Sequence, residues 1–303
     1  MGTDSAGGSD LWKPRELKAL PLAAWVPRAE ILRLALRLQR PPTPYLTVLT
    51  PAIPKKTGTG ALDHRLLAIF SAVYRVEAMA LFAKTRGWLV QHTHKSCHGG
   101  VPGEEALDAA WDCQAEIENA MFRQKGHTVI TMDYYKFFDY FDHDFTKEML
   151  IHVGIHPDLA NYLHNLNRSM TRVIKIGKAW GPNFSVTNGL GQGDPLSLIP
   201  ALILVTWQFN MLDKKHPKVT KGAVVDDRNL RGECDDVAEA YRDAADFDAK
   251  AGHILQHEKT MVTTTTKNEA KNAKTLDFEG HRPKAANQQI VVGNLISTSM
   301  KQR

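Results

Sequence analysis

Two hydrophobic periods alternate along the chain, which predicts interleaved helices and strands. Apolar residues recur at helical spacing in residues 29–38, 66–85, 104–123, 145–152, 157–168, 196–212 and 235–251. Short β-branched runs predict strands at residues 45–53, 127–133, 223–225 and 253–263, with a hairpin at 172–187 around Gly181-Pro182 and another that ends near residue 296. A polar loop is expected at residues 264–274. Interleaving of this kind favours a mixed α+β domain with an antiparallel core sheet.

The first 44 residues are predicted to form a lead that precedes the main domain. Its helix is followed by Pro41, Pro42 and Pro44, which cannot continue a helix and form a stiff connector. The longest apolar run, residues 196–205, is too short to span a bilayer. No secretion signal is recognised near the N-terminus. We therefore expect an intracellular protein, nuclear or cytoplasmic, that is not secreted and has no transmembrane segment or membrane partner.

Composition and charge narrow the class of protein only slightly. The 303 residues are 43% hydrophobic and 23% charged, which is typical of a globular chain with one large domain or two small ones. A net charge of +5 is compatible with a polyanionic partner. Cys97, Cys113 and Cys234 are too widely spaced for a disulfide framework or a CxxC zinc site, so reduced thiols are expected.

Two of the predicted strands end in acidic residues. Asp133 closes the strand at 127–133, and Asp226 with Asp227 follow the apolar run at 223–225. Taken alone, the Asp-Asp pair favours a solvated turn at a hairpin tip, because like charges this close resist joint ionisation. If an antiparallel sheet brought the strand ends together, three carboxylates would form a cluster that selects Mg²⁺ or Mn²⁺. A pair of such ions can serve phosphoryl transfer.

Seven segments carry motifs in a distinctive order. They are AIPKKTGTGALDHRLLAIFSAVYRV (52–76), HGGVPGEEALDAAWDCQAEIE (98–118), MDYYKFFD (132–139), GLGQGDPLS (189–197), VVDD (224–227), HEKT (257–260) and VVGNLIS (291–297). Across nearly all of residues 46–297 the chain resembles the reverse transcriptase domain of non-LTR (LINE-type) retrotransposons. The resemblance implies a right-hand polymerase within residues 45–303, with fingers at about 45–125 and 155–187, a palm at about 126–154 and 188–303, and no thumb.

The resemblance also implies which residues act. Asp133, Asp226 and Asp227 would hold two Mg²⁺ ions, for which Mn²⁺ can substitute, and the carbonyl of Tyr134 would assist. Lys259 would protonate the departing pyrophosphate. The implied reaction is addition of deoxynucleotides to the 3′-hydroxyl of a DNA primer on an RNA template.

The implied substrate contacts come from other motifs. Lys55 and Arg65 would hold the triphosphate through charge-assisted contacts. Phe138 stands where the family has an aromatic gate that excludes a 2′-hydroxyl. Gln192 and Gly193 would lie against the templating base pair, since glycine permits a close approach of the backbone.

Several residues depart from the family pattern, although no metal ligand is lost. Val224 replaces an aromatic residue and Phe137 replaces an alanine. Glu104 and Glu105 replace basic and hydroxyl residues, and His64 and Leu66 flank Arg65 in place of an aromatic residue and a proline. Such changes are typical of a drifted or truncated copy. Two alternatives stay open: an impaired remnant that only binds nucleic acid, and a group II intron-like or retron-like reverse transcriptase or RNA-dependent RNA polymerase of the same fold.

Other clusters receive structural interpretations. For His92, His94, Cys97 and His98 a plain loop is favoured over a zinc site. A second acidic pair, Asp235-Asp236, is expected to cap the helix at 235–251, and Asp142 and Asp144 to cap the helix that follows them. Trp111, Trp180 and Trp207 are expected in the core rather than on base-stacking surfaces.

Overall fold

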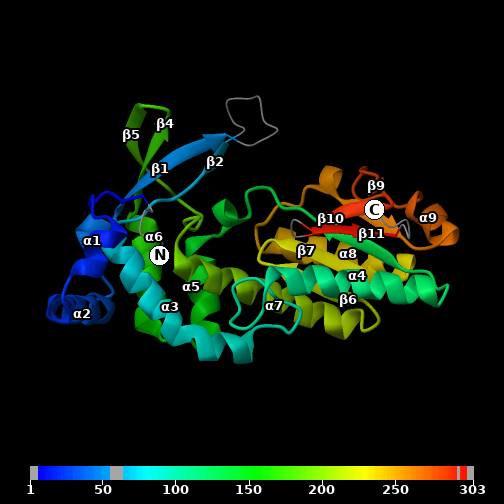
Figure 1. Ribbon diagram of the computed structural model, residues 1–303, viewed down its shortest axis with the longest axis horizontal. Coiled ribbons are helices and arrows are strands. Elements are labelled where there is room, and N and C mark those ends of the chain that lie inside the picture. Colours follow the sequence, from blue (N-terminus) through cyan, green and yellow to red (C-terminus); the bar gives the residue numbers. More distant parts are fainter. Residues whose placement is uncertain (1–5, 55–63, 292–293, 299–303) are drawn as a thin grey trace. The chain divides into compact units, whose positions relative to one another are not determined.

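The computed structural model describes residues 6–54, 64–291 and 294–298 of the chain. Helices and strands interleave along it (Figure 1). They form two compact units: unit 1 comprises residues 1–85 and 138–200, and unit 2 comprises residues 86–137 and 201–303. Helices α3 (Ala72–His92) and α7 (Leu198–Lys215) each contain a boundary between the units.

Unit 1 is built on a four-stranded sheet in the order β2-β1-β4-β5. The strands are β1 (Thr47–Pro54), β2 (His64–Leu66), β4 (Thr171–Ile176) and β5 (Ala179–Ser185), and only the β1–β4 pairing is parallel. The helices of this unit include α1 (Pro14–Ala19), α2 (Leu22–Arg37), α5 (His143–His152) and α6 (Pro157–Ser169), and short 3₁₀ turns lie at Thr43–Tyr45, Phe137–Tyr140 and Pro195–Ser197. Within this unit α6 packs against both α2 and α5.

Aromatic rings and a partly buried ion pair, in which Glu77 is the buried partner, lie in the interior of unit 1. The ring of Tyr74 lies 5.3 Å from that of Tyr45 and 5.1 Å from that of Phe70. Glu77 accepts hydrogen bonds from Arg28 and from the Tyr45 hydroxyl, each at 2.7 Å. A carboxylate buried in an apolar interior requires such partners.

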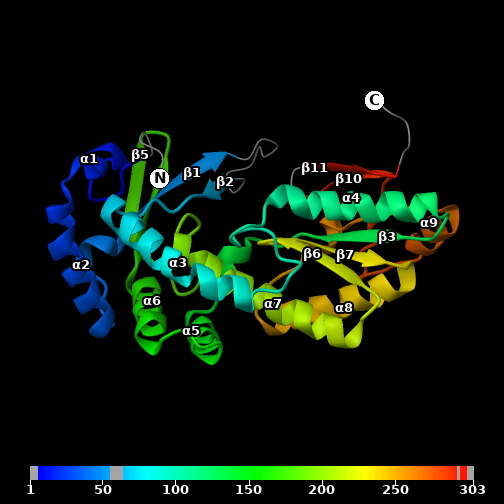
Figure 2. The ribbon, with the colours of Figure 1, turned by 60° about the horizontal axis from the view of Figure 1, so that its bottom comes forward.

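Unit 2 is built on a five-stranded sheet in the order β6-β7-β3-β8-β9. Its strands are β6 (Thr220–Val224), β7 (Asp227–Gly232), β3 (Thr128–Met132), β8 (Met261–Thr264) and β9 (Lys284–Ala285), and only β8–β9 is parallel. Figure 2 shows α4 (Ala106–Phe122) on one side of the sheet and α8 (Cys234–Lys250) on the other. The unit also contains α9 (Lys267–Ala273), a 3₁₀ turn at His257–Lys259, and a hairpin of β10 (Gln288–Val291) and β11 (Asn294–Ser297). The antiparallel sheet packed on helices confirms the predicted fold class.

The helix α8 shows how the sequence pattern produces this packing. Val237, Ala240, Tyr241 and Ala244 are fully buried, as their helical spacing predicts. The same stripe continues at Asp248, which is 0% exposed. One acid therefore lies within an otherwise apolar face.

The structure corrects several predicted elements. The helix of the N-terminal lead begins at Leu22 and runs through Pro27. The β4–β5 hairpin turns at Gly177, whose φ of 61° suits a tight turn, whereas Gly181-Pro182 lie inside β5. The expected loop at 264–274 contains α9, because the Thr266 side chain accepts a hydrogen bond from the Glu269 amide and caps that helix.

Two tryptophans and one apolar segment also differ from expectation. Trp111 and Trp180 are 65% and 50% exposed, so neither belongs to the core. The helical stretch Pro195–Lys215 is longer than the predicted apolar run and passes a length-and-composition test for a membrane span, alone among the described residues. Since 72% of its most apolar window is buried inside the protein, it also fits a core helix.

Candidate active site

The ends of β3 and β7 bring the two acidic motifs together in unit 2. Met132 pairs with Arg228 across the antiparallel ladder, so Asp133 and Asp227 lie at the same end of neighbouring strands. Val224 pairs with Asp227 in the β6–β7 hairpin, which leaves only Val225 and Asp226 in the turn. The ends of the two strands therefore lie side by side, which is the backbone arrangement that the predicted carboxylate cluster needs.

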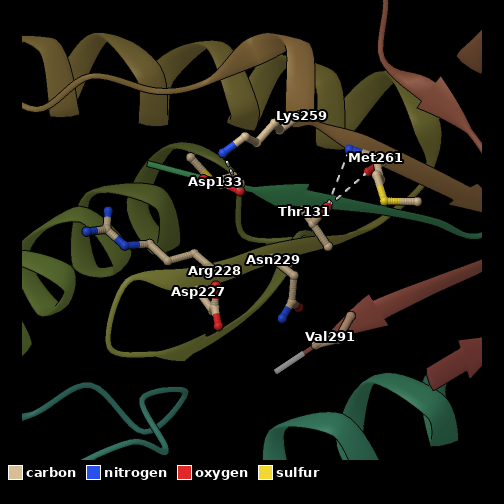
Figure 3. Close-up of a pocket in the computed structure, with 9 residues that line it drawn as sticks. Thr131, Asp133, Asp227, Arg228, Asn229, Lys259, Met261 and Val291 are labelled. Atoms are coloured by element: carbon tan, nitrogen blue, oxygen red, sulfur yellow. Dashed lines mark hydrogen bonds and ion pairs between the residues drawn. The ribbon is translucent and has the colours of Figure 1, made fainter. Parts of the chain in front are cut away.

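A small pocket of about 130 Å³ opens at this end of the sheet (Figure 3). Its lining includes Asp133, Asp227 and Lys259. The Lys259 Nζ lies 3.7 Å from Asp133 Oδ2, and the two side chains are 52% and 47% exposed. Solvent therefore reaches an acid and an ammonium group held side by side.

The donor set of this pocket fits a hard divalent cation. Side chains alternate along a strand, so Asp133 and Asp227 occupy the same face of the sheet as Thr131 and Asn229, which also line the pocket. Carboxylate oxygens that solvent can reach are the usual ligands of Mg²⁺ and Mn²⁺. The half-buried Asp226, in the adjoining turn, can add a further carboxylate.

Tyr134, whose carbonyl is predicted to assist, directly follows Asp133. Tyr134 forms an isolated bridge with Leu255, just beyond the end of β3. The backbone hydrogen bonds around that bridge use the carbonyls of Asp133 and Ile254 as acceptors. The bridge therefore does not occupy the Tyr134 carbonyl.

The β6–β7 turn that holds Asp226 is strained and is supported by a neighbouring loop. Val225 has φ of 58°, a left-handed conformation that is costly for a β-branched residue. The His98 amide donates to the Ala223 carbonyl, and the Ala223 amide donates to the Ser96 carbonyl, each at 2.8 Å. A Cβ on Gly99 would lie 2.6 Å from Val224 Cγ1, so only glycine fits against this turn. Sequence reasoning missed Gly99, although a GG dipeptide in a motif was the available signal.

The histidine-rich loop next to this turn does not form the zinc site that its sequence allows. His94 pairs through Nε2 with Asp213 at 2.9 Å, and its amide donates to Thr206. His98 instead lies with Glu104 and Asp108, and their potential ligand atoms fall within 4.8 Å of one another. Both acids are exposed, and exposed acids often gather without an ion. The loop is thus a structural support.

A buried polar cluster lies on the other face of the sheet. Arg228 and Asp248 form an ion pair at 3.0 Å, with both side chains 0% exposed. Tyr134 and Gln208 each donate a hydrogen bond to the same carboxylate at 2.6 Å. Sequence reasoning missed this cluster, although an acid in the apolar stripe of α8 was a visible signal.

The glycine-rich loop in unit 1 is shaped by close backbone contacts. The Gln192 carbonyl accepts a hydrogen bond from the Ala68 amide at 2.9 Å. Gly193 has φ of 116°, and a Cβ there would lie 2.8 Å from the Ala68 carbonyl oxygen. The Phe138 carbonyl accepts from the Leu190 amide at 2.7 Å, which ties this loop to the first acidic motif.

Asp194, within the same loop, is a buried residue that the sequence did not single out. Its carboxylate accepts hydrogen bonds from the Tyr74 hydroxyl at 2.8 Å and the Leu196 amide at 3.1 Å. Burial raises the pKa of Asp194 to about 6, although both hydrogen bonds act in the opposite direction. Its role is to hold the loop against α3.

Two further predicted substrate ligands, Arg65 and Lys55, belong to the first motif. Arg65 is exposed on β2, where it pairs with Ile53 of β1. Lys55 lies outside the described residues.

Comparison with known proteins finds similarity to a curated sequence and to solved structures. No family model matches the chain. Over 161 residues it is 26% identical to a retrovirus-related Pol polyprotein from the type-1 retrotransposable element R2 of Popillia japonica. The aligned region covers 52% of this chain and 22% of that protein. The chain thus spans about a fifth of its curated relative.

Solved structures of telomerase from Candida tropicalis share the fold. An apo form truncated at its C-terminal domain has a TM-score of 0.58 and 14% identity, over 84% of this chain and 54% of that one. A complex with the TWJ fragment of telomeric RNA has a TM-score of 0.57 and 14% identity, over 91% of this chain and 49% of the telomerase chain. The polymerase fold is therefore confirmed, and together the two likenesses support the resemblance to a reverse transcriptase domain.

Proposed function

We propose that this chain is the fingers and palm of a retrotransposon RNA-directed DNA polymerase, which adds deoxynucleotides to a primer 3′-hydroxyl. The observation that carries the proposal is the meeting of Asp133 and Asp227 on neighbouring strands, with Asp226 in the adjoining turn and Lys259 at 3.7 Å from Asp133. A solvated hairpin tip would need neither the second acidic strand nor the lysine.

Five residues at or beside this pocket then have a task. Asp133, Asp226 and Asp227 would hold two Mg²⁺ ions, which when bound assist both the attacking and the leaving oxygen of a phosphoryl transfer. Lys259 is an ammonium donor beside them and passes a proton to the pyrophosphate as it leaves. The Tyr134 carbonyl adds an uncharged oxygen ligand.

The residues of unit 1 serve the nucleotide and the template. Phe138 excludes a 2′-hydroxyl by bulk, and Arg65 and Lys55 hold the triphosphate. The bare backbone of Gly193, beside Gln192, allows close approach of the templating base pair. The RNA-bound telomerase complex supports an RNA partner for this fold. Such an enzyme acts inside the cell, in the nucleus or cytoplasm, where its substrates are.

The β4–β5 hairpin supports a nucleic-acid partner independently of the pocket. Residues 171–187 contain no acid. Trp180 is 50% exposed, and Lys175 Nζ lies 4.8 Å from the centre of its ring. An exposed ring beside a cation suits base stacking and phosphate contact on a single strand.

Primer extension tests the proposal. Wild-type chain is expected to extend a DNA primer on an RNA template with deoxynucleotides and Mg²⁺, and Asp226→Ala to abolish extension while retaining primer–template binding in fluorescence anisotropy. Asp235→Ala, in the other Asp-Asp pair, is the matched control and should extend normally. Binding without extension by the wild type would indicate an inert remnant instead. A preference for ribonucleotides would contradict the role of Phe138.

A further inference from the structure

Arg228 follows Asp227 directly, yet its side chain lies in the interior of unit 2. Successive side chains of a strand point to opposite faces of a sheet, so Arg228 is directed away from the face that Asp227 occupies (Figure 3). Its Nη1 lies 3.0 Å from Asp248 Oδ1 of α8, and both side chains are 0% exposed. The residue next to one candidate metal ligand is therefore tied to a helix behind the sheet.

The residue next to the other candidate ligand is tied to the same carboxylate. Tyr134 follows Asp133, and its hydroxyl donates to Asp248 Oδ2 at 2.6 Å. Its ring also lies 4.4 Å from Arg228 Cζ, a distance at which a cation and a π-system attract. Asp248 thus connects the neighbours of Asp133 and Asp227, which belong to different strands.

Gln208 of α7 completes the cluster. Its Nε2 donates to Asp248 Oδ2 at 2.6 Å, and its Oε1 accepts from Arg228 at 2.8 Å. Burial raises the pKa of Tyr134 well above its usual value, so the phenol remains a donor. Burial opposes the charge of Arg228, but Tyr134 and Asp248 outweigh it and keep the pKa of the guanidinium above its ordinary value. The two charges pair through Arg228 Nη1, whereas the Nε and Nη2 atoms of Arg228 are buried without a hydrogen-bond partner.

Stability alone does not account for this pair. Desolvating two ions is costly, and well-packed apolar residues of similar volume often give equal or greater stability than a buried ion pair. An ion pair also fixes the orientation of its two side chains, because a planar guanidinium and a carboxylate can pair in only a few geometries. In this protein the contacts with Asp248 fix the orientation of Arg228 and Tyr134, which are the chain neighbours of Asp227 and Asp133.

We propose that Arg228 and Asp248 are positioning residues that hold Asp133 and Asp227 at the separation needed to bind divalent cations. The proposal rests on the metal-binding role given to these acids in the proposed function. The side chains of Arg228 and Asp248 are fully buried, and they act through the backbone of β3 and β7. The outer partners of metal ligands commonly act in this way.

A Mn²⁺ titration, followed by the electron paramagnetic resonance signal of the free ion, tests the proposal without catalysis. Tyr134→Phe removes only the hydroxyl, and Arg228→Lys keeps the charge but loses the planar fork. Both are expected to weaken Mn²⁺ binding about 10- to 100-fold, the usual loss when an outer partner of a metal ligand is removed. Thermal unfolding should show that both variants remain folded.

Arg231→Lys is the matched control. Arg231 lies on the same strand, its side chain is 4% exposed, and it pairs with Glu116 at 3.0 Å. Its substitution should change stability without changing Mn²⁺ affinity. If Arg228→Lys does not fold, the double variant Arg228→Met with Asp248→Leu removes both buried charges and should show the same loss of Mn²⁺ affinity.

Primer extension adds a second measurement. The positioning variants should need more Mg²⁺ for half-maximal rate and show a lower kcat, with an unchanged KM for the nucleotide. Wild-type Mn²⁺ affinity in Tyr134→Phe and in the double variant, or an equal loss in Arg231→Lys, would overturn the inference. A wild type that binds Mn²⁺ but extends no primer would overturn the proposed function alone, and one that binds no Mn²⁺ would overturn both.

Discussion

Two Asp-Asp pairs in unit 2 have the same sequence and similar exposure, but the fold surrounds them differently. Asp226-Asp227 lie in a tight hairpin turn beside Asp133, with Lys259 within 3.7 Å of that third acid. Asp235-Asp236 lie in the first turn of α8. At a helix start, backbone amides and the helix dipole stabilise carboxylates without any ion.

The difference shows what makes an acidic pair a candidate metal site. In each pair one aspartate is exposed and the other is half-buried, so solvent exposure does not distinguish the two pairs. A third carboxylate at the end of a neighbouring strand does, because it concentrates negative charge that a bound cation would neutralise. The first pair therefore favours a cation, and the second is satisfied by its own helix.

The largest expected effect is from removing the third carboxylate. Asp133→Asn should lower the rate of primer extension by at least about 1,000-fold, because metal assistance is worth several kcal/mol and each 1.36 kcal/mol is about tenfold. Single-turnover extension measures this loss. Asp235→Asn should extend at the wild-type rate, and an equal loss in both variants would remove the distinction between the pairs.

The next effect concerns the turn that holds the first pair. Gly99→Ala would place a Cβ 2.6 Å from Val224 and 3.1 Å from Val225, so the turn must shift. We expect a loss of up to about 100-fold in extension rate, as for displacements of about 1 Å at a reacting centre. Gly87→Ala, with nothing within 4 Å of its Cβ, is the control and should keep full activity. Full activity of Gly99→Ala would show that the turn tolerates movement.

A third effect is acid sensitivity near the first pair, where His253 lies close to the charge of Arg228. Burial, and then the charge of Arg228, lower the pKa of His253 to about 4. The unfolded chain, with a histidine pKa of 6.5, binds more protons between pH 6.5 and 4, so the folded state loses stability as pH falls through that range. His253→Gln should flatten the fall of the unfolding midpoint from pH 7 to 4.5. His92→Gln, at an exposed position, is the control and should leave this fall unchanged. An equal dependence of the unfolding midpoint on pH in His253→Gln and wild type would contradict the role given to His253.

The smallest effect is expected at the second pair. Asp235→Asn should destabilise α8 by about 0.3–1 kcal/mol, the usual contribution of an acid to the start of a helix. Urea unfolding at low and high salt measures it, since salt screens the dipole interaction. A salt-independent loss would point to a contact other than the dipole.

Much of the fold and of the site follows from local pattern. The apolar stripe of α8 and the strand at residues 127–133 were visible as periodicity, because each buries one face or stripe against a neighbour. The motif order also placed Asp133, Asp226 and Lys259 on three separate segments, and the pocket brings Asp133, Asp227 and Lys259 together. Their catalytic roles remain predictions.

Other features were hidden because they depend on long-range contacts. Trp180 resembles a core residue in sequence, yet β5 is exposed along its length. Gly99 looks like a loop glycine until Val224 packs against it. Arg228 and Asp248, both charged, would be placed on the surface by residue type alone.

The sequence by itself determined most of the helices and strands and the α+β class, since periodicity and turn chemistry act over a few residues, and its motif order singled out the candidate acids. Only the tertiary structure decided that Asp133 and Asp227 end neighbouring strands, and that Asp248 joins the residues beside them. The order of the strands and the pairing of buried side chains depend on which distant segments pack against each other and exclude water. The pattern of residues along the chain does not specify which segment will be the partner.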